Sequence, residues 1–217
     1  PWGYEYTIYR NLNHLSVTLL KINHNKSTSL HCHPNKKTGF ILISGRALIQ
    51  LGLWKDTAEY YNAPSKLMIR TGLFHSIKAV SKNGVFALEF ESPVDKNDLV
   101  RFKDDYGRET KPYEDKKFTK KIQSNFIKFQ KPQLNKNQTY KMSKVEISLE
   151  VHKNFKKLVN KKNSVIFAIL DGKIIDKQGK NVLSYGDIIK TGTLKKLSEV
   201  FKIKKHLTVL SVSKKLN

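Results

Sequence analysis

The sequence is poor in cysteine and in long apolar runs. Its 217 residues include a single cysteine, Cys32, which excludes an internal disulfide and is typical of a protein from a reducing compartment. No apolar run approaches the roughly 20 residues that a membrane-spanning helix needs. We therefore expect a soluble, cytoplasmic protein with no membrane partner.

Acidic residues and arginine are also scarce. The chain has 18 acidic and 41 basic residues, 36 of them lysine, and a formal net charge of +23. The excess lies in residues 116–217, which carry +19, whereas residues 1–115 carry +4. Sequence-specific nucleic-acid binding uses arginines and aromatic platforms that this pattern lacks, and a lysine excess can simply reflect an AT-rich genome. We expect a weakly attractive field for an anionic substrate and no specific nucleic-acid partner.

Short strand-like segments follow one another through the first half of the chain. They are rich in β-branched and aromatic residues, and turn-prone residues such as Ser44 and Gly45 separate them. Helical periodicity is almost absent. Short strands at this regular spacing predict an all-β fold, either a barrel or a sandwich. The predicted strands are residues 4–10, 15–23, 40–43, 46–51, 66–69, 74–80 and 85–91.

The composition changes after the last of these strands. Charged residues are dense between residues 92 and 129, and residues 116–126 could form a basic helix. A β-pattern then resumes, with clean apolar–polar alternation first. The later strand-like segments are residues 145–151, 164–170 and 207–212. We predict a domain at 1–110, a basic linker at 111–129 and a second domain at 130–217.

The two halves share a degenerate internal repeat. Residues 69–75, Ile-Arg-Thr-Gly-Leu-Phe-His, align with residues 189–195, Ile-Lys-Thr-Gly-Thr-Leu-Lys, and the turn at Gly45 aligns with Gly172. The second copy keeps the glycines but lacks the histidine. We therefore predict a second, degenerate copy of the same barrel with a structural or oligomerisation role. A basic anion-binding face on this copy is an alternative.

Three histidines are the strongest candidates for a functional site. His31 and His33 lie one residue apart on an extended segment, so their side chains project to the same face. His75 follows another apolar strand through a tight glycine turn. Three neutral imidazoles leave positions open for water or substrate, as catalytic metal sites do. We predict one divalent transition metal, Zn, Fe, Ni or Mn, at these histidines; the alternative is a sugar-binding site without an ion.

Two carboxylates are candidates for the acid–base groups of such a site. Glu89 and Glu91 are separated by one residue and therefore share one face of their strand. A carboxylate that points into a partly apolar barrel has a raised pKa suited to proton transfer. The alternative is that both side chains project into solvent.

Basic residues near the histidines are candidates for binding an anionic substrate. Arg70 lies just before the glycine turn that leads to His75, where its guanidinium could clamp a phosphate bidentately. Lys36 and Lys37 follow the first two histidines and could contribute only as point charges. We rank Arg70 first among these three.

These residues resemble the first sequence motif of the cupin superfamily. That motif consists of a glycine, five residues, His-x-His, then a glutamate and a glycine seven residues further on. His31, His33 and Gly45 match it. Asn25 stands at the first glycine, and Thr38 occupies the glutamate position. The family's acidic ligand is therefore missing from its usual place.

The second cupin motif, Pro-x-Gly-x-x-His, is matched by Gly72 and His75, with Arg70 in place of the proline. The resemblance implies a double-stranded β-helix, the jelly-roll barrel of cupins. Two tandem copies, a bicupin arrangement, would explain the internal repeat.

Within the superfamily, the chain is similar to the cupin domain of type II mannose-6-phosphate isomerase. Its opening, Pro-Trp-Gly-Tyr-Glu-Tyr, resembles that family's Pro-Trp-Gly-x-Tyr signature, and residues 98–108 resemble its closing tail. The likeness covers residues 1–110 and makes Arg101 and Arg108 of the tail candidate substrate-binding residues. The alternative is that these two arginines only pin the tail to the barrel. It implies a metal-dependent isomerase or epimerase of a sugar phosphate or nucleotide sugar in surface polysaccharide synthesis. We also expect a homodimer.

The substitution at Thr38 leaves two other functions open. One is a non-catalytic cupin that binds a sugar phosphate and regulates or scaffolds a partner enzyme. The other is an iron-dependent oxygenase, because three histidines without a carboxylate also support oxygen chemistry. Whether the protein is an enzyme is therefore undecided at this level.

Overall fold

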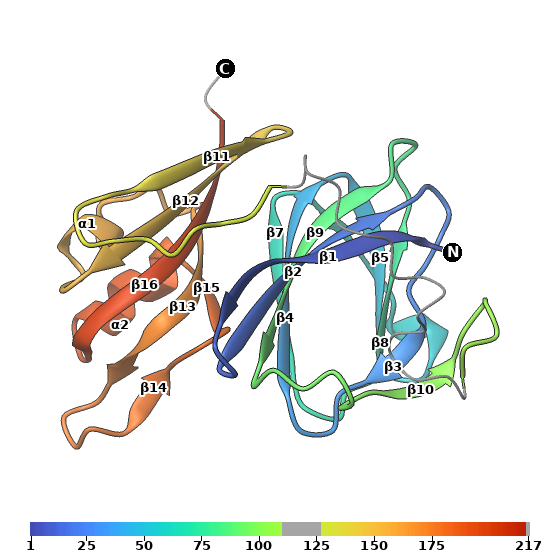
Figure 1. Cartoon of the computed structure of the whole chain (residues 1–217), viewed down its shortest axis with the longest axis horizontal. Coiled ribbons are helices and arrows are strands. Elements are labelled where there is room, and N and C mark those ends of the chain that lie inside the picture. Colours follow the sequence, from blue (N-terminus) through green and yellow to red (C-terminus); the bar gives the residue numbers. More distant parts are fainter. Residues whose placement is uncertain (110–126, 216–217) are drawn as a thin grey trace.

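The computed structural model describes residues 1–109 and 127–215. The predicted basic helix at 116–126, and with it most of the predicted linker, lies outside the described residues. Within them the chain forms antiparallel β-sheets, which confirms the predicted all-β class (Figure 1). The described part of the chain contains no helix that is both long and apolar enough to cross a membrane.

The first half folds as a double-stranded β-helix in which two five-stranded sheets face each other (Figure 1). All seven predicted strands of this half are present. The first sheet has the order β1 (Gly3–Asn11), β2 (Leu15–Ile22), β9 (Val85–Ser92), β4 (Lys37–Ser44) and β7 (Ser65–Ile69). The second sheet has the order β10 (Val100–Lys103), β3 (Leu30–Cys32), β8 (His75–Ala79), β5 (Arg46–Leu51) and β6 (Glu59–Asn62), with a 3-10 turn η1 (Lys55–Thr57) before β6.

The interior of this barrel is apolar at one end and polar at the other. Phe40 and Leu42 of β4 and Ala87 of β9 belong to the apolar cluster that fills one end. Because side chains alternate along a strand, Thr38, Glu89 and Glu91 share the inward face with these residues. The buried polar groups at that end also include Ser16, Thr18, His33, Lys36 and His75. The fold therefore gathers the sequence-predicted histidines and carboxylates in one place.

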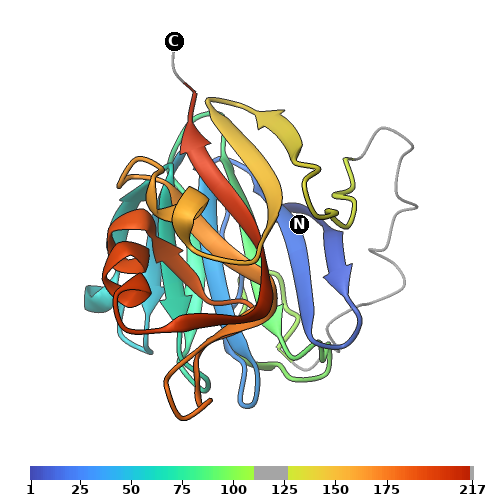
Figure 2. The same ribbon diagram turned by 90° about the vertical axis from the view of Figure 1, so that its left-hand side faces the viewer.

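The second half forms a third sheet with two helices on its outer side (Figure 2). This six-stranded sheet contains β11 (Gln138–Met142), β12 (Val145–His152), β16 (Lys202–Lys214), β13 (Ile166–Ile175) and β14 (Asn181–Leu183), and β15 (Ile188–Lys190) pairs with β13. The helices are α1 (Lys156–Val159) and α2 (Thr191–Ser198). Leu158 and Leu194 anchor them in an apolar cluster on the outer face of the sheet.

One hydrophobic core joins the third sheet to the barrel. Ile41 and Phe90 on the outer face of the first sheet share a cluster with Ile147 and Leu210 of the third sheet. Phe129, the last residue of the predicted linker, is buried in the same cluster, and its N–H donates to the Ile8 carbonyl oxygen at 2.8 Å. The continuous apolar run of β4 is explained by this arrangement, because both faces of the strand are buried.

The glycines that define the internal repeat occupy different structures in the two halves. Gly45 lies in the turn between β4 and β5 with φ +86°, whereas Gly172 lies inside β13 at an irregularity in its pairing with β16. Gly72 lies in the turn before β8, whereas Gly192 lies within α2. In the described residues the second half is one sheet with two helices, and a second complete barrel stays a prediction.

A buried polar network lies between the third sheet and its helices. The Glu150 carboxylate accepts hydrogen bonds from His152 Nε2 at 3.1 Å and from Ser211 Oγ at 3.2 Å, and it forms an ion pair with Lys161. Burial alone would raise the pKa of Glu150, but its hydrogen bonds with His152 and Lys161 lower the pKa to about 2. The carboxylate is therefore more acidic in the folded protein than in the unfolded chain.

This depressed pKa makes the free energy of unfolding depend on pH. Stability from the ionised carboxylate is complete above the ordinary pKa of 4.5 and is lost as the pH falls toward about 2. We expect this loss to amount to about 3 kcal/mol, and Glu150→Gln to remove it. Urea unfolding of both proteins between pH 5 and pH 2 measures the difference, and parallel pH profiles would contradict the assignment.

Gly39 in β4 lies directly against Ile188 of the third sheet and Met68 of β7. A Cβ atom at this position would lie 2.7 Å from both Ile188 Cδ1 and Met68 Sδ. We expect Gly39→Ala to lower the free energy of unfolding by about 1–3 kcal/mol, because the core must overpack. Ile188→Val removes Cδ1, so the double variant should lose less than the sum of the two single losses in urea unfolding. Strict additivity would show that the two residues do not press on each other.

Candidate metal centre

The three histidines come together because the second sheet pairs their strands. His31 in β3 stands directly opposite His75 in β8, and His33 follows two residues after His31. The ring centroids are 4.5 Å apart for His31 and His75, 5.0 Å for His31 and His33, and 5.4 Å for His33 and His75. Their ligand nitrogens lie within 4.8 Å of one another, so the three imidazoles could hold one metal ion.

Each imidazole is oriented by a backbone carbonyl. Nδ1 of His33 lies 2.7 Å from the Asp98 oxygen, Nδ1 of His75 lies 3.0 Å from the Leu73 oxygen, and Nδ1 of His31 lies 2.8 Å from the Ser29 oxygen. A carbonyl only accepts, so Nδ1 carries the proton in all three rings and Nε2 keeps its lone pair. Outer hydrogen bonds of this kind fix the tautomer of metal-binding histidines.

The burial of the Nε2 atoms also favours a bound metal ion. Those of His33 and His75 are buried and have no hydrogen-bond partner among the described residues. An unpaired buried acceptor is costly, and a bound cation would satisfy both atoms. Burial, followed by the charge of Lys36, lowers the pKa of His33 to about 3, and burial lowers that of His75 to about 4. The rings are thus neutral at pH 7, the form that binds a metal.

The two predicted carboxylates point into the barrel beside the histidines. Ligand atoms of His33, Glu89 and Glu91 lie within 4.8 Å of one another, so His33 belongs to both groups. Thr38, at the position where cupins carry a glutamate, stands opposite Glu91 in the β4–β9 pairing. Burial and the neighbouring charge of Glu91 raise the pKa of Glu89 well above its ordinary value. The protonated form of Glu89 is therefore favoured more than in an ordinary glutamate.

Lys36 lies inside the barrel rather than on its surface. Its side chain is 1% exposed, its ammonium group forms an ion pair with Glu91, and it donates to the Asp95 carbonyl oxygen at 3.0 Å. Ser16 Oγ donates to the other oxygen of Glu91 at 3.3 Å. A buried charge is stable only when it is paired, and here Lys36 and Glu91 pair with each other.

Asp98 is a supporting residue that sequence reasoning missed. Its carboxylate accepts from the backbone N–H groups of Asn35 at 3.0 Å and Lys36 at 2.8 Å, and its carbonyl oxygen orients His33. The residue thus fixes the turn between β3 and β4 on which Lys36 lies. Its place at the start of the family-like tail was the available signal, because that tail returns as β10 beside β3.

Of the other four predicted substrate-binding residues, two lie near the histidines and two are paired with acidic residues elsewhere. Arg101 in β10 stands opposite His31 and shares its face of the sheet. Arg70 is exposed on the turn whose Gly72 N–H donates to the His33 carbonyl oxygen at 2.8 Å. The remaining two are occupied elsewhere: Lys37 Nζ lies 2.8 Å from Asp187 Oδ1 of the second half, and Arg108 holds Asp104 with Nε at 2.9 Å and Nη2 at 2.6 Å.

Comparisons with known proteins bear on the fold. No protein-family profile matches the sequence, and no curated protein matches it. Among solved structures, a double-stranded β-helix domain of Klebsiella pneumoniae is 14% identical with a TM-score of 0.42, over 47% of this chain and 82% of that one. A Bacillus halodurans protein is 23% identical with a TM-score of 0.36, over 38% of this chain and 65% of that one. CapF, a capsular polysaccharide assembling protein of Staphylococcus aureus, is 16% identical with a TM-score of 0.42, over 48% and 32%.

The chain thus spans just under two thirds of the Bacillus protein and about a third of CapF. Identities and TM-scores at this level are too low to transfer an activity. The strand order of this chain itself defines the first half as a double-stranded β-helix, with a candidate metal centre at its polar end.

Removal of one histidine ligand tests the metal centre. We expect His33→Ala to weaken binding of Co²⁺ or Zn²⁺ by more than the roughly 10–100-fold that loss of an outer-shell partner costs. His24→Ala is the matched control, because His24 is exposed and hydrogen-bonded to the Ser81 carbonyl oxygen outside the site. Titration of the metal-free proteins, followed by Co²⁺ absorption, measures both. Equal affinities would rule out the three-histidine site.

Proposed function

We propose that this protein is a metal-dependent isomerase or epimerase that acts on a sugar phosphate or a nucleotide sugar. The observation that carries the proposal is the shared position of His33, whose imidazole belongs both to the histidine group and to the group with Glu89 and Glu91. A metal ligand and two carboxyl groups within reach of one another are the components that proton transfer next to a carbonyl requires.

The histidines are the metal-holding part of this proposal. Nε2 of His31, His33 and His75 would bind one divalent transition metal, which supplies a Lewis acid that polarises a sugar carbonyl. The backbone carbonyls behind Nδ1 hold the three rings in place, so little reorganisation is needed when substrate arrives. The identity of the metal stays open among Zn, Fe, Ni and Mn.

The carboxyl groups divide the acid and base roles between them. The raised pKa of Glu89 favours its protonated form, so Glu89 is the candidate acid that donates to a substrate oxygen. Glu91 forms the ion pair with Lys36 and is the candidate base that takes the proton from carbon. Two neighbouring carboxyl groups in unlike environments are a common arrangement for such paired roles.

Basic residues around the polar end support an anionic substrate. Arg101 lies on the same sheet face as His31, and Arg70 lies on the turn that is hydrogen-bonded to the His33 backbone. The exposed guanidinium group of Arg70 can bind a phosphate with two parallel hydrogen bonds. Arg101 adds positive charge, and its Nη1 already donates to the Arg108 carbonyl oxygen at 3.2 Å. Surface polysaccharide synthesis, a cytoplasmic location and a homodimeric state stay predictions.

Replacement of Glu89 tests its catalytic role. We expect Glu89→Gln to reduce turnover about 10²–10⁴-fold, because the amide cannot donate the proton, while metal binding is retained. Glu59→Gln, on the exposed edge strand β6, is the control that should keep full activity. Turnover of a panel of hexose phosphates and nucleotide sugars, with metal content measured on the same samples, is the assay. Full activity of Glu89→Gln would refute the role.

Metal removal separates this proposal from its two rivals. We expect chelation to abolish turnover and a divalent ion to restore it without oxygen uptake. A strict requirement for iron together with oxygen uptake would instead establish an oxygenase. Absence of turnover with every member of the panel, together with a saturable thermal shift by one sugar phosphate, would establish a binding protein. Full turnover by the metal-free protein would overturn the proposal.

A further inference from the structure

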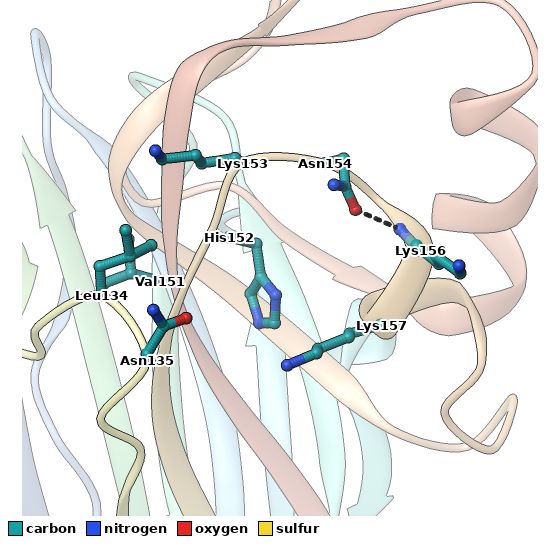
Figure 3. Close-up of a pocket in the computed structure, with 8 residues that line it drawn as sticks. All are labelled: Leu134, Asn135, Val151, His152, Lys153, Asn154, Lys156 and Lys157. Atoms are coloured by element: carbon teal, nitrogen blue, oxygen red, sulfur yellow. Dashed lines mark hydrogen bonds between the residues drawn. The ribbon is translucent and has the colours of Figure 1, made fainter.

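A cavity lies in the second half of the chain, away from the three histidines. It opens where β12 ends and α1 begins, and its volume is about 350 Å³, at the small end of the range for ligand pockets (Figure 3). The side chains that line it include Asn135, His152, Lys153, Asn154, Lys156 and Lys157. The cavity therefore combines amide, imidazole and ammonium groups.

The lining carries positive charge without a carboxylate to offset it. Among the described residues that line the cavity, three are lysines and none is acidic. The lysines are Lys153, Lys156 and Lys157. The nearest acid in the network beneath, Glu150, is already neutralised by its ion pair with Lys161. The field in the cavity thus favours an anion.

His152 is a buried polar side chain that points into this cavity (Figure 3). It is 8% exposed, and its Nε2 atom donates to the Glu150 carboxylate at 3.1 Å. Glu150 is in turn fixed by Ser211 Oγ at 3.2 Å. The network holds the ring in one orientation and leaves Nδ1 to bind a ligand, for instance the hydroxyl of a phosphate monoester.

Three groups from three segments converge in the cavity. Figure 3 shows the Asn135 amide, the His152 ring and the Lys157 ammonium group directed toward one another, whereas the Lys156 ammonium group is directed away. Asn135 has a φ of +63°, a left-handed conformation that asparagine tolerates, in the turn before β11. An amide, an imidazole and an ammonium group around one point are the donors and acceptor that a phosphate group needs.

We propose that this cavity binds the phosphate group of a small phosphorylated molecule. The proposal is independent of the metal centre and of the activity proposed for it, because no residue is common to the two sites. Lys157 would donate to the phosphate oxygens, and His152 would accept from the phosphate hydroxyl. Lys153 would add charge at the rim.

Phosphate titration of the full chain tests the proposal. To exclude phosphate binding at the barrel, both the reference protein and its variants carry Arg70→Gln and Arg101→Gln. We expect one saturable site for inorganic phosphate by calorimetry, with a shift of the His152 imidazole resonances in NMR spectra. Lys157→Gln should weaken binding about tenfold or more, because a charge-assisted hydrogen bond is lost, and Lys157→Arg should restore most of it.

A matched lysine variant provides the control. Lys196→Gln on α2 makes the same charge change at an exposed residue outside the cavity and should alter the affinity no more than about twofold. Glucose 6-phosphate binding more tightly than inorganic phosphate would show that the ligand is a phosphate ester, and equal binding would show that phosphate alone is recognised. Equal weakening by Lys157→Gln and Lys196→Gln, no shift of His152, or binding only of a single-stranded oligonucleotide would overturn the proposal.

Discussion

The central strands β2, β9 and β4 of the first sheet are buried on both faces, and much of the remaining structure depends on this burial. The inner face of this sheet closes the barrel, and its outer face shares a continuous apolar core with the third sheet. Apolar burial of this extent is the main favourable term in folding. The same strands, β4 and β9, carry Thr38, Glu89 and Glu91 at their polar end. The second half therefore supports the candidate centre by packing against the sheet that forms its wall.

Desolvation gives the polar end of the barrel its chemistry. Neutral imidazoles, the raised pKa of Glu89 and the Lys36–Glu91 ion pair all follow from placing ionisable groups where water is excluded. Fixed hydrogen bonds to backbone carbonyls offset part of the cost of burial and orient the rings. Such an environment is typical of sites where a metal and acid–base groups act together.

The second half has a polar network of a different kind. Glu150 there is acidic because hydrogen bonds and Lys161 outweigh its burial, whereas Glu89 is weakly acidic because burial and a like charge dominate. Two buried carboxyl groups of one protein thus have pKa values shifted in opposite directions. The physical difference is the number of donors around each group, which only the local packing decides.

The sequence by itself determined the all-β class and the strand positions of the first half, and it singled out the three histidines as candidate metal ligands. Period-two alternation and the His-x-His spacing are local properties, so both can be read without the fold. The sequence also placed Glu89 and Glu91 on one face of a strand. Only the tertiary structure decided that this face points into the barrel and that Lys36 is buried against Glu91, and only it turned Lys37 toward Asp187 in the second half. Strand pairing and the packing of the third sheet are long-range contacts, and no local pattern encodes which face they cover.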